Sequence, residues 1–198
     1  MKPTRVWIDV GAHLGEKTFS DAAGDSSLRV YAFEPNLAVA SQRIGALPNF
    51  VVIPMAIAEQ DGCANFYVNS FAAASSLLPF NSQGLEKWID GDLLRVEQTI
   101  AVPTIRLDTF LHRMDIREVE YLKVDAQGAD LAVIRSAGAR LADIERISLE
   151  VQITPDPLYE GASEKASVIE CLHGAGFTLV STERQSHDQE ENLMFERL

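Results

Sequence analysis

Short apolar runs rich in β-branched residues alternate along this chain with longer segments of helical period, and this alternation limits the fold more than any other feature. Such alternation is typical of βαβ units, in which helices connect the strands of a parallel sheet. Because the runs are apolar along their centres, we predict an α/β fold with helices on both faces of the sheet. The predicted strands are residues 5–10, 28–33, 50–54, 120–124 and 146–151.

Apolar residues recur at helical spacing in the intervening segments, and we predict helices over residues 14–23, 37–47, 130–141 and 163–174. The last ends in Gly174-Ala175-Gly176, which suits a left-handed C-terminal cap. Two further runs, residues 177–181 and 192–196, flank the polar loop 182–191. Their spacing predicts an antiparallel pair of strands at one edge of the sheet.

Residues 69–100 interrupt the alternation and are too long for an ordinary connection. We predict that they form a lid or a substrate-binding insertion, with a plain surface excursion as the alternative. Ser75 and Ser76 are its candidate substrate-binding residues, and Phe71, Phe80 and Trp88 are candidates to wall a pocket. Tyr159, which follows the last parallel strand, is a further candidate for substrate binding.

Length and charge narrow the class of protein. At 198 residues the chain suits a single domain over residues 1–198. Its net charge of −12 would repel phosphate backbones and anionic membranes, so we expect neither nucleic acid nor membrane as a partner.

The two cysteines, Cys63 and Cys171, form no metal or disulfide pattern. With no signal segment and no apolar run of membrane-spanning length, we predict a cytoplasmic protein.

The segment DVGAHLG, residues 9–15, directly follows the first predicted strand and opens the first predicted helix. Gly11 would allow a tight turn and Gly15 a close approach to a ligand, beside backbone N–H groups that face a polar group. The spacing Gly-x-x-x-Gly differs from the Gly-x-Gly-x-x-Gly that brings backbone against a pyrophosphate. The acid Asp9, two residues before Gly11, is poorly placed for a diphosphate but well placed for a ligand that carries an ammonium group.

The second strand ends in Glu34, followed by Pro35 and Asn36, about 20 residues beyond the glycine loop. A carboxylate at this place accepts both hydroxyls of a ribose. A ligand with an amino-acid end, a nucleoside end and no phosphate is S-adenosylmethionine. The residues that we predict to bind it are Asp9, Gly11, Ala12, His13, Gly15, Glu34, Pro35, Asn36, Ala56 and Asp125.

These motifs resemble those of the FkbM-type S-adenosylmethionine-dependent methyltransferases from about residue 6 almost to the C-terminus. The loop at 9–15 and the segment YAFEPN at 31–36 resemble the first two family motifs, and VPTIRLDTF at 102–110 with YLKVDAQGAD at 121–130 are more specific. Gln127 departs from the more common Glu. The resemblance implies a Rossmann-like class I methyltransferase fold with seven strands, the last antiparallel. It also implies O-methylation of a hydroxyl on a sugar, glycan or other natural product.

Methyl transfer to a hydroxyl needs a group that removes the proton. Four acids, Asp9, Glu34, Asp125 and Glu150, are predicted to end parallel strands and so to meet at one sheet edge. Asp125 is our leading candidate for the catalytic base and His13 the second, with Glu150 assigned to substrate binding. Lys123 is either structural or catalytic. Asp125 and Glu150 would supply oxygen ligands to a divalent metal, but their spacing does not require one, and we predict no metal.

Two other function classes remain open at this point. An NAD(P)-dependent oxidoreductase would use the same sheet edge and the same ribose-binding acid, although its glycine fingerprint is missing. The second alternative is a non-catalytic binding module, which would keep the pocket for the donor but not transfer its methyl group. The residues specify neither the individual acceptor nor an oligomeric state.

Overall fold

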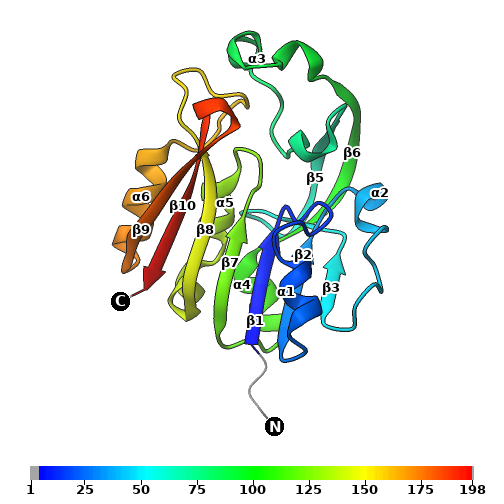
Figure 1. Cartoon of the computed structure of the whole chain (residues 1–198), viewed down its shortest axis with the longest axis vertical. Coiled ribbons are helices and arrows are strands. Elements are labelled where there is room, and N and C mark those ends of the chain that lie inside the picture. Colours follow the sequence, from blue (N-terminus) through cyan, green and yellow to red (C-terminus); the bar gives the residue numbers. More distant parts are fainter. Residues whose placement is uncertain (1–4, 198) are drawn as a thin grey trace.

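A seven-stranded β-sheet forms the centre of the computed structural model, which describes residues 5–197 (Figure 1). The strand order is β3-β2-β1-β7-β8-β10-β9. Neighbouring strands from β3 to β8 are parallel, and β10 is antiparallel to both β8 and β9. The strands are β1 Arg5–Val10, β2 Leu28–Phe33, β3 Phe50–Ile53, β7 Val119–Val124, β8 Ile144–Gln152, β9 Phe177–Gln185 and β10 Glu190–Arg197. The predicted class, a mostly parallel sheet of seven strands with the last antiparallel, is confirmed.

The order of the strands creates a switch point beside β1. The chain winds from β1 through β2 to the edge strand β3, and later returns to the other side of β1 as β7. Loops that leave the carboxyl ends of β1 and β7 therefore turn in opposite directions. In open α/β sheets, ligands bind in the crevice that this reversal leaves.

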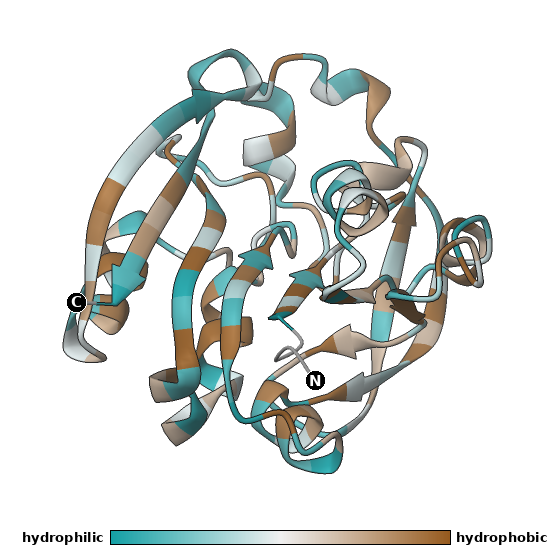
Figure 2. Ribbon diagram, turned by 60° about the horizontal axis from the view of Figure 1, so that its bottom comes forward, coloured by the Kyte–Doolittle hydropathy of each residue, from teal (hydrophilic) through white to brown (hydrophobic). Residues whose placement is uncertain are grey.

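Two apolar cores occupy the two faces of the sheet. On β2, the alternate residues Tyr31 and Phe33 belong to the larger core, and Val30 and Ala32 to the smaller one. Helices α4 (Leu107–Arg113), α5 (Asp130–Ser136) and α6 (Lys165–Gly174) pack on the first core, and α1 (Phe19–Gly24) packs on the second. Hydrophobic residues recur along the strands and on the helices beside them (Figure 2). The prediction of helices on both faces is thus confirmed.

The first two predicted helices are much shorter than expected. Residues 13–18 form turns, and α1 begins only at Phe19, because Gly11, His13 and Gly15 have positive φ angles that a right-handed helix excludes. Of the helix predicted over residues 37–47, only α2 (Leu37–Ala40) forms, and turns follow it up to Gly45. There the hydrogen bonds change to the three-residue spacing of a tighter turn.

The later helices lie close to their predicted positions. The segment predicted over residues 130–141 is divided into α5 and the 3₁₀-helix η3 (Gly138–Asp143), because Gly138 has φ +52°. Helix α6 begins at Lys165 and is followed by Gly176 at φ +86°, the expected left-handed cap.

The predicted polar loop over residues 182–191 is wrong in extent. Strand β9 continues to Gln185 and β10 begins at Glu190, leaving only a short connection around the 3₁₀-helix η4 (Ser186–Asp188). Strand β9 lies at the sheet edge and is mostly exposed, so polar residues occupy it without loss of core contacts.

A second sheet of three strands was not predicted. It has the order β4-β6-β5 and consists of β4 (Ala56–Ile57), β5 (Gly62–Asn69) and β6 (Val96–Ile105). Its small core contains Ala56, Phe66 and Val102. Between β5 and β6 the chain forms η1 (Ala72–Ala74), α3 (Ser82–Lys87) and η2 (Gly91–Leu93). The ends of the predicted insertion are therefore paired strands.

Candidate active site

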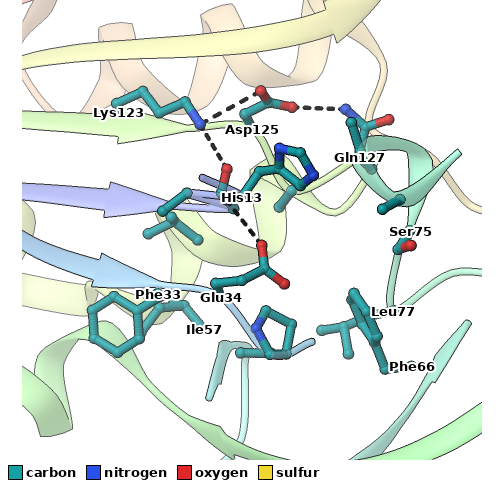
Figure 3. Close-up of a pocket in the computed structure, with 18 of the residues that line it drawn as sticks. His13, Phe33, Glu34, Ile57, Phe66, Ser75, Leu77, Lys123, Asp125 and Gln127 are labelled. Carbon is teal, nitrogen blue, oxygen red and sulfur yellow. Dashed lines mark hydrogen bonds and ion pairs between the residues drawn. The ribbon is translucent and has the colours of Figure 1, made fainter. Parts of the chain in front are cut away.

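A cavity of about 240 Å³ opens between the carboxyl ends of β1, β2 and β7 and residues of the second sheet (Figure 3). Eight of the residues predicted to bind cofactor or substrate line it: Gly11, Ala12, His13, Glu34, Pro35, Ala56, Ser75 and Asp125. Six others do not: Asp9, Gly15, Asn36, Ser76, Glu150 and Tyr159. The three aromatic residues proposed as walls, Phe71, Phe80 and Trp88, do not line it either.

Gly11 is required where the loops after β1 and β7 meet. Its φ is +69°, and an added Cβ atom would lie 1.9 Å from the carbonyl oxygen of Asp125. A side chain here would therefore push apart the two loops that carry the lining residues. Gly15 also has positive φ, but its close neighbour is the ring of Phe50, where a Cβ would lie 2.7 Å away. Gly15 therefore packs against an aromatic ring and does not line the cavity, and its predicted contact with the ligand stays a prediction.

Glu34 presents a held carboxylate to the cavity. Its Oε2 accepts from the backbone N–H of His13 at 2.9 Å, and its Oε1 accepts from the backbone N–H of Asn36 at 2.8 Å. Burial raises the pKa of Glu34, and these two hydrogen bonds oppose the rise. Each carboxylate oxygen retains a further lone pair, so this group is able to accept the two hydroxyls of a ribose.

His13 lies in the glycine loop at φ +47° and pairs with a neighbouring acid. Its Nδ1 is 2.7 Å from Oε1 of Glu16, and both side chains line the cavity. Partial burial raises the pKa of Glu16, but its hydrogen bonds, first that with His13, lower it overall. His13 is thus a pocket residue oriented by its own loop.

Lys123 and Asp9 form a buried ion pair behind the cavity. The β1–β7 register places Asp9 opposite Lys123, with 3.1 Å between Oδ1 and Nζ. The other oxygen of Asp9 accepts from the hydroxyl of Thr18 at 2.6 Å, so Asp9, only 1% exposed, is occupied by protein groups. The strand register turns the side chain toward Lys123, and the predicted contact of Asp9 with the donor stays a prediction.

Lys123 connects the two strand ends that flank the switch point. Its Nζ donates to the carbonyl of Gly11 at 2.8 Å and lies 3.5 Å from Oδ2 of Asp125 (Figure 3). Burial alone would lower the pKa of Lys123, but the carboxylates of Asp9 and Asp125 raise it above its usual value. Lys123 is therefore charged and holds Asp125 electrostatically.

Asp125 leads into a strained loop whose residues form a polar network. Gln127 has φ +50° and donates from Nε2 to Oδ1 of Asp125 at 2.7 Å; Glu150 Oε2 is 3.4 Å from the same nitrogen. The carboxylate of Asp130 accepts from the backbone N–H groups of Ala126 and Gly128. Burial raises the pKa of Asp130 to about 7. Burial and the charge of Asp125 raise the pKa of Glu150 to about 9.

Ser76 and Tyr159 hold the roof of the cavity instead of lining it. The hydroxyl of Ser76 donates to the carbonyl of Gln127 at 2.7 Å. The hydroxyl of Tyr159 is 2.8 Å from both the carbonyl of Ala74 and Oε1 of Gln127. Their predicted contact with substrate is thus replaced by contacts that join residues 74–76 to the loop after β7.

The roof itself is apolar. Phe66, Leu77, Ala72 and Ala73 line the cavity from the second sheet and the segment that follows β5. Of the three expected aromatic residues, Phe80 stacks on Tyr159 with ring centroids 5.4 Å apart, and Phe71 is 63% exposed. The roof is formed by Phe66, Leu77 and small alanine side chains, and by none of the three expected aromatic residues.

Several important residues were missed or left undecided by the sequence analysis. The signal for Lys123 was its spacing of two from Asp125, which puts both on one side of β7. Gln127 was noted only as a departure from a family motif. Asp130 stood only as the last residue of the family-like segment at 121–130, and nothing in the sequence pattern marks Thr18 or the apolar residues Met55, Ile57, Phe66 and Leu77.

The lining fits an S-adenosyl group. Glu34 presents a carboxylate that is able to accept ribose hydroxyls, the loop after β1 closes against the strand ends, and Met55, Ile57, Phe66 and Leu77 offer apolar surface against which a base is able to pack. Within residues 5–197, no cluster of three or more His, Cys, Asp or Glu side chains is arranged to hold a metal ion. In the same range, no helix has the length and apolar character to cross a membrane.

A mostly parallel seven-stranded sheet whose last strand is antiparallel is the Rossmann-like fold of S-adenosylmethionine-dependent methyltransferases. Within this class the chain belongs to the FkbM methyltransferase family, because residues 9–179 match the methyltransferase FkbM domain. The methyl donor of this family is S-adenosylmethionine.

The chain is also similar to individual proteins. It is 24% identical over 186 residues to 2-O-methyltransferase NoeI of Sinorhizobium fredii (strain NBRC 101917 / NGR234), covering 86% of this chain and 72% of the relative. Its fold matches magnesium protoporphyrin IX methyltransferase of Synechocystis PCC 6803 with a TM-score of 0.51, at 12% identity over 99% of this chain and 71% of that one. It matches fibrillarin of Aeropyrum pernix with a TM-score of 0.52, at 11% identity over 98% of this chain and 66% of that one.

Proposed function

We propose that this protein transfers the methyl group of S-adenosylmethionine to a hydroxyl of a small molecule, either a sugar or glycan or another natural product. The observation that carries this proposal is the carboxylate of Asp125, which lines the same cavity as Glu34 and is held beside a buried lysine. The similarity to a protein named as a 2-O-methyltransferase supports a hydroxyl as the acceptor.

For donor binding, we assign the ribose hydroxyls to Glu34 and the base to the apolar residues Ile57, Phe66 and Leu77. Gly11, Ala12 and His13 form the loop that closes against the donor, with Pro35 and Ala56 as further contacts. When bound, the donor supplies an electrophilic methyl group on a sulfonium. The protein does not need to activate that group and instead has to orient the acceptor.

For the acceptor, we assign Asp125 as the base that takes the hydroxyl proton as charge develops on the oxygen. Lys123 stabilises the ionised carboxylate before that step. Gly11 lets the loops after β1 and β7 meet closely, and this contact holds the Asp125 carboxylate in one position. His13 lines the cavity and is the second candidate for the base, held by Glu16.

We further assign residues 72–75 of the roof as the acceptor-facing wall, with Ser75 as its polar lining group. The hydroxyl of Ser75 accepts from the backbone N–H of Asn69 at 3.0 Å and retains its own proton for a ligand. Apolar alanines around it suit a flat or weakly polar part of the acceptor.

The test is transfer of an isotopically labelled methyl group. Wild-type protein is incubated with methyl-labelled donor and a panel of small hydroxyl-bearing metabolites, and the products are analysed by mass spectrometry. Label in a methyl ether supports the proposal, and the Asp125→Asn variant should abolish most of it. Label only on nitrogen or carbon would contradict the assignment of a hydroxyl acceptor. Stabilisation by NADH but not by S-adenosylhomocysteine in thermal unfolding would contradict the donor.

A further inference from the structure

The loop after β7 is held in an unusual backbone conformation. Gln127 has φ +50° although it carries a full side chain, and Gly128 follows at φ +90°. The carboxylate of Asp130 fixes the loop by accepting from the N–H groups on both sides of Gln127, at 2.9 and 3.1 Å. A left-handed residue other than Gly or Asn persists only where its surroundings enforce it, and such residues cluster at functional sites.

The side chain of Gln127 bridges two parts of the site. Its Nε2 donates to Oδ1 of Asp125 at 2.7 Å (Figure 3). Its Oε1 is 2.8 Å from the hydroxyl of Tyr159. A carboxylate only accepts, and the phenol carries one proton, which faces both the amide oxygen of Gln127 and the carbonyl of Ala74, so this orientation of the amide matches both neighbours. Asp125 is thereby held at two points, since its Oδ2 faces Lys123 at 3.5 Å.

The same residue is joined to the roof of the cavity. The carbonyl of Gln127 accepts from the hydroxyl of Ser76, and Tyr159 lies between its side chain and the carbonyl of Ala74. Residues 74–76 therefore cannot move away without loosening the contacts that orient the Gln127 amide.

We propose that Gln127 is a positioning residue, which fixes the carboxylate of Asp125 and links its orientation to the roof of the cavity. The inference rests on the proposed function insofar as Asp125 acts on the acceptor. Gln127 itself takes no proton; its amide stabilises the charge on Asp125 and prevents rotation of that carboxylate. Two-point support of this kind keeps a reacting group in the required geometry.

The neighbouring acid Glu150 reports on this arrangement. It faces Asp125 from β8, together with Asp130 from α5, Glu190 from β10, Tyr159 from the loop after β8 and Lys123 from β7. With Asp125 ionised, Glu150 keeps its proton to about pH 9. The doubly ionised pair depends on the Gln127 amide, which donates to Asp125 at 2.7 Å and lies 3.4 Å from Oε2 of Glu150, so removing that donor should make the last proton of the pair harder to lose.

The experiment follows the carboxyl carbon of Glu150 by ¹³C NMR during a pH titration of the labelled protein, with the signal assigned from Glu150→Gln. Gln127→Asn suits the left-handed backbone but its side chain is too short to bridge Asp125 and Tyr159. Gln127→Met keeps the length and removes the amide. Gln83→Asn, at an exposed position of α3, is the control.

We expect both Gln127 variants to raise the pKa of Glu150 by about one unit or more, and the control to leave this pKa unchanged. If Glu150 has the same pKa in the two variants as in the wild-type protein, the inference is overturned. The measurement needs no acceptor. Calorimetry with S-adenosylhomocysteine is performed in parallel: failure of the wild-type protein to bind it would contradict the proposed function, while the titration would still decide the role of Gln127.

Discussion

Asp9 and Lys123 face each other across the β1–β7 pair, with 3.1 Å between the carboxylate oxygen and the ammonium nitrogen. The acid of the glycine motif thus serves the interior of the sheet. It neutralises a lysine whose nitrogen also contacts the carbonyl of Gly11 and the carboxylate of Asp125. One buried cation therefore ties together the first strand, its loop and the candidate base.

Removing this cation should destabilise the whole domain. In Lys123→Met the buried carboxylate of Asp9 loses its charged partner, and breaking a buried ion pair costs about 3–5 kcal/mol. Urea unfolding measures the change. Lys87→Met, which breaks an exposed pair with Asp156, is the control and should cost about 1 kcal/mol or less. Equal effects of the two variants would show that the Lys123 pair is not structural.

The assignment of Glu34 to the donor ribose predicts a loss of donor affinity on substitution. Glu34→Gln removes a charged acceptor, and a hydrogen bond to a charged group contributes about 1.5–3 kcal/mol. Calorimetry with S-adenosylhomocysteine should show the weaker binding. Glu86→Gln, at an exposed position of α3, should bind as the wild type does. Unchanged affinity in Glu34→Gln would place the ribose elsewhere.

Gly11 should tolerate no side chain. In Gly11→Ala the new methyl group meets the carbonyl of Asp125, and the residue is strained at φ +69°, so the loops must shift. We expect a loss of stability above about 1 kcal/mol in denaturant unfolding, together with weaker donor binding. Gly24→Ala adds a methyl group in open space and should change neither property. Wild-type behaviour of Gly11→Ala would contradict the close contact of the two loops.

Asp125→Asn should separate binding from chemistry. The amide keeps the shape of the side chain but cannot take the acceptor proton. The maximal rate of methyl transfer should fall about 10²- to 10⁴-fold, with nearly unchanged donor affinity. Steady-state kinetics and calorimetry provide the two values. A full rate in this variant would transfer the role of base to His13.

Glu150 should make stability depend on pH. Its pKa is raised to about 9 in the folded protein by burial and by the charge of Asp125, whereas an unfolded glutamate has a pKa of about 4.3. Between these values the folded protein holds more protons than the unfolded chain, so this group lowers stability as pH rises.

Glu150→Gln removes that dependence. The free energy of unfolding of the variant should increase relative to wild type from about pH 6 to about pH 9, as measured by urea titrations across this range. Glu145→Gln, exposed on the same strand, provides the control and should show no such trend. A constant difference between Glu150→Gln and wild type would mean that Glu150 is ionised in the folded state.

The main sheet was predictable because its inner strands are covered on both faces and appear as apolar runs. The second sheet was not, because β5 and β6 have one exposed face and lack such a run. The positions of Glu34 and Asp125 followed from strand ends alone. Those of Asp9 and Tyr159 depend on register and on the path of a loop, which single residues in a sequence do not reveal.

The second sheet begins at Ala56, just after the edge strand β3, and returns through β6 to α4 on the main core. The chain thus leaves the parallel sheet and rejoins it at neighbouring places, since Ala56 and Thr104 are paired. The upper wall of the cavity is consequently a replaceable module. Exchanging residues 62–105 with the corresponding segment of a relative should alter the acceptor-facing wall and, through Phe66 and Leu77, the proposed contacts of the donor base, while Glu34 and the glycine loop stay the same.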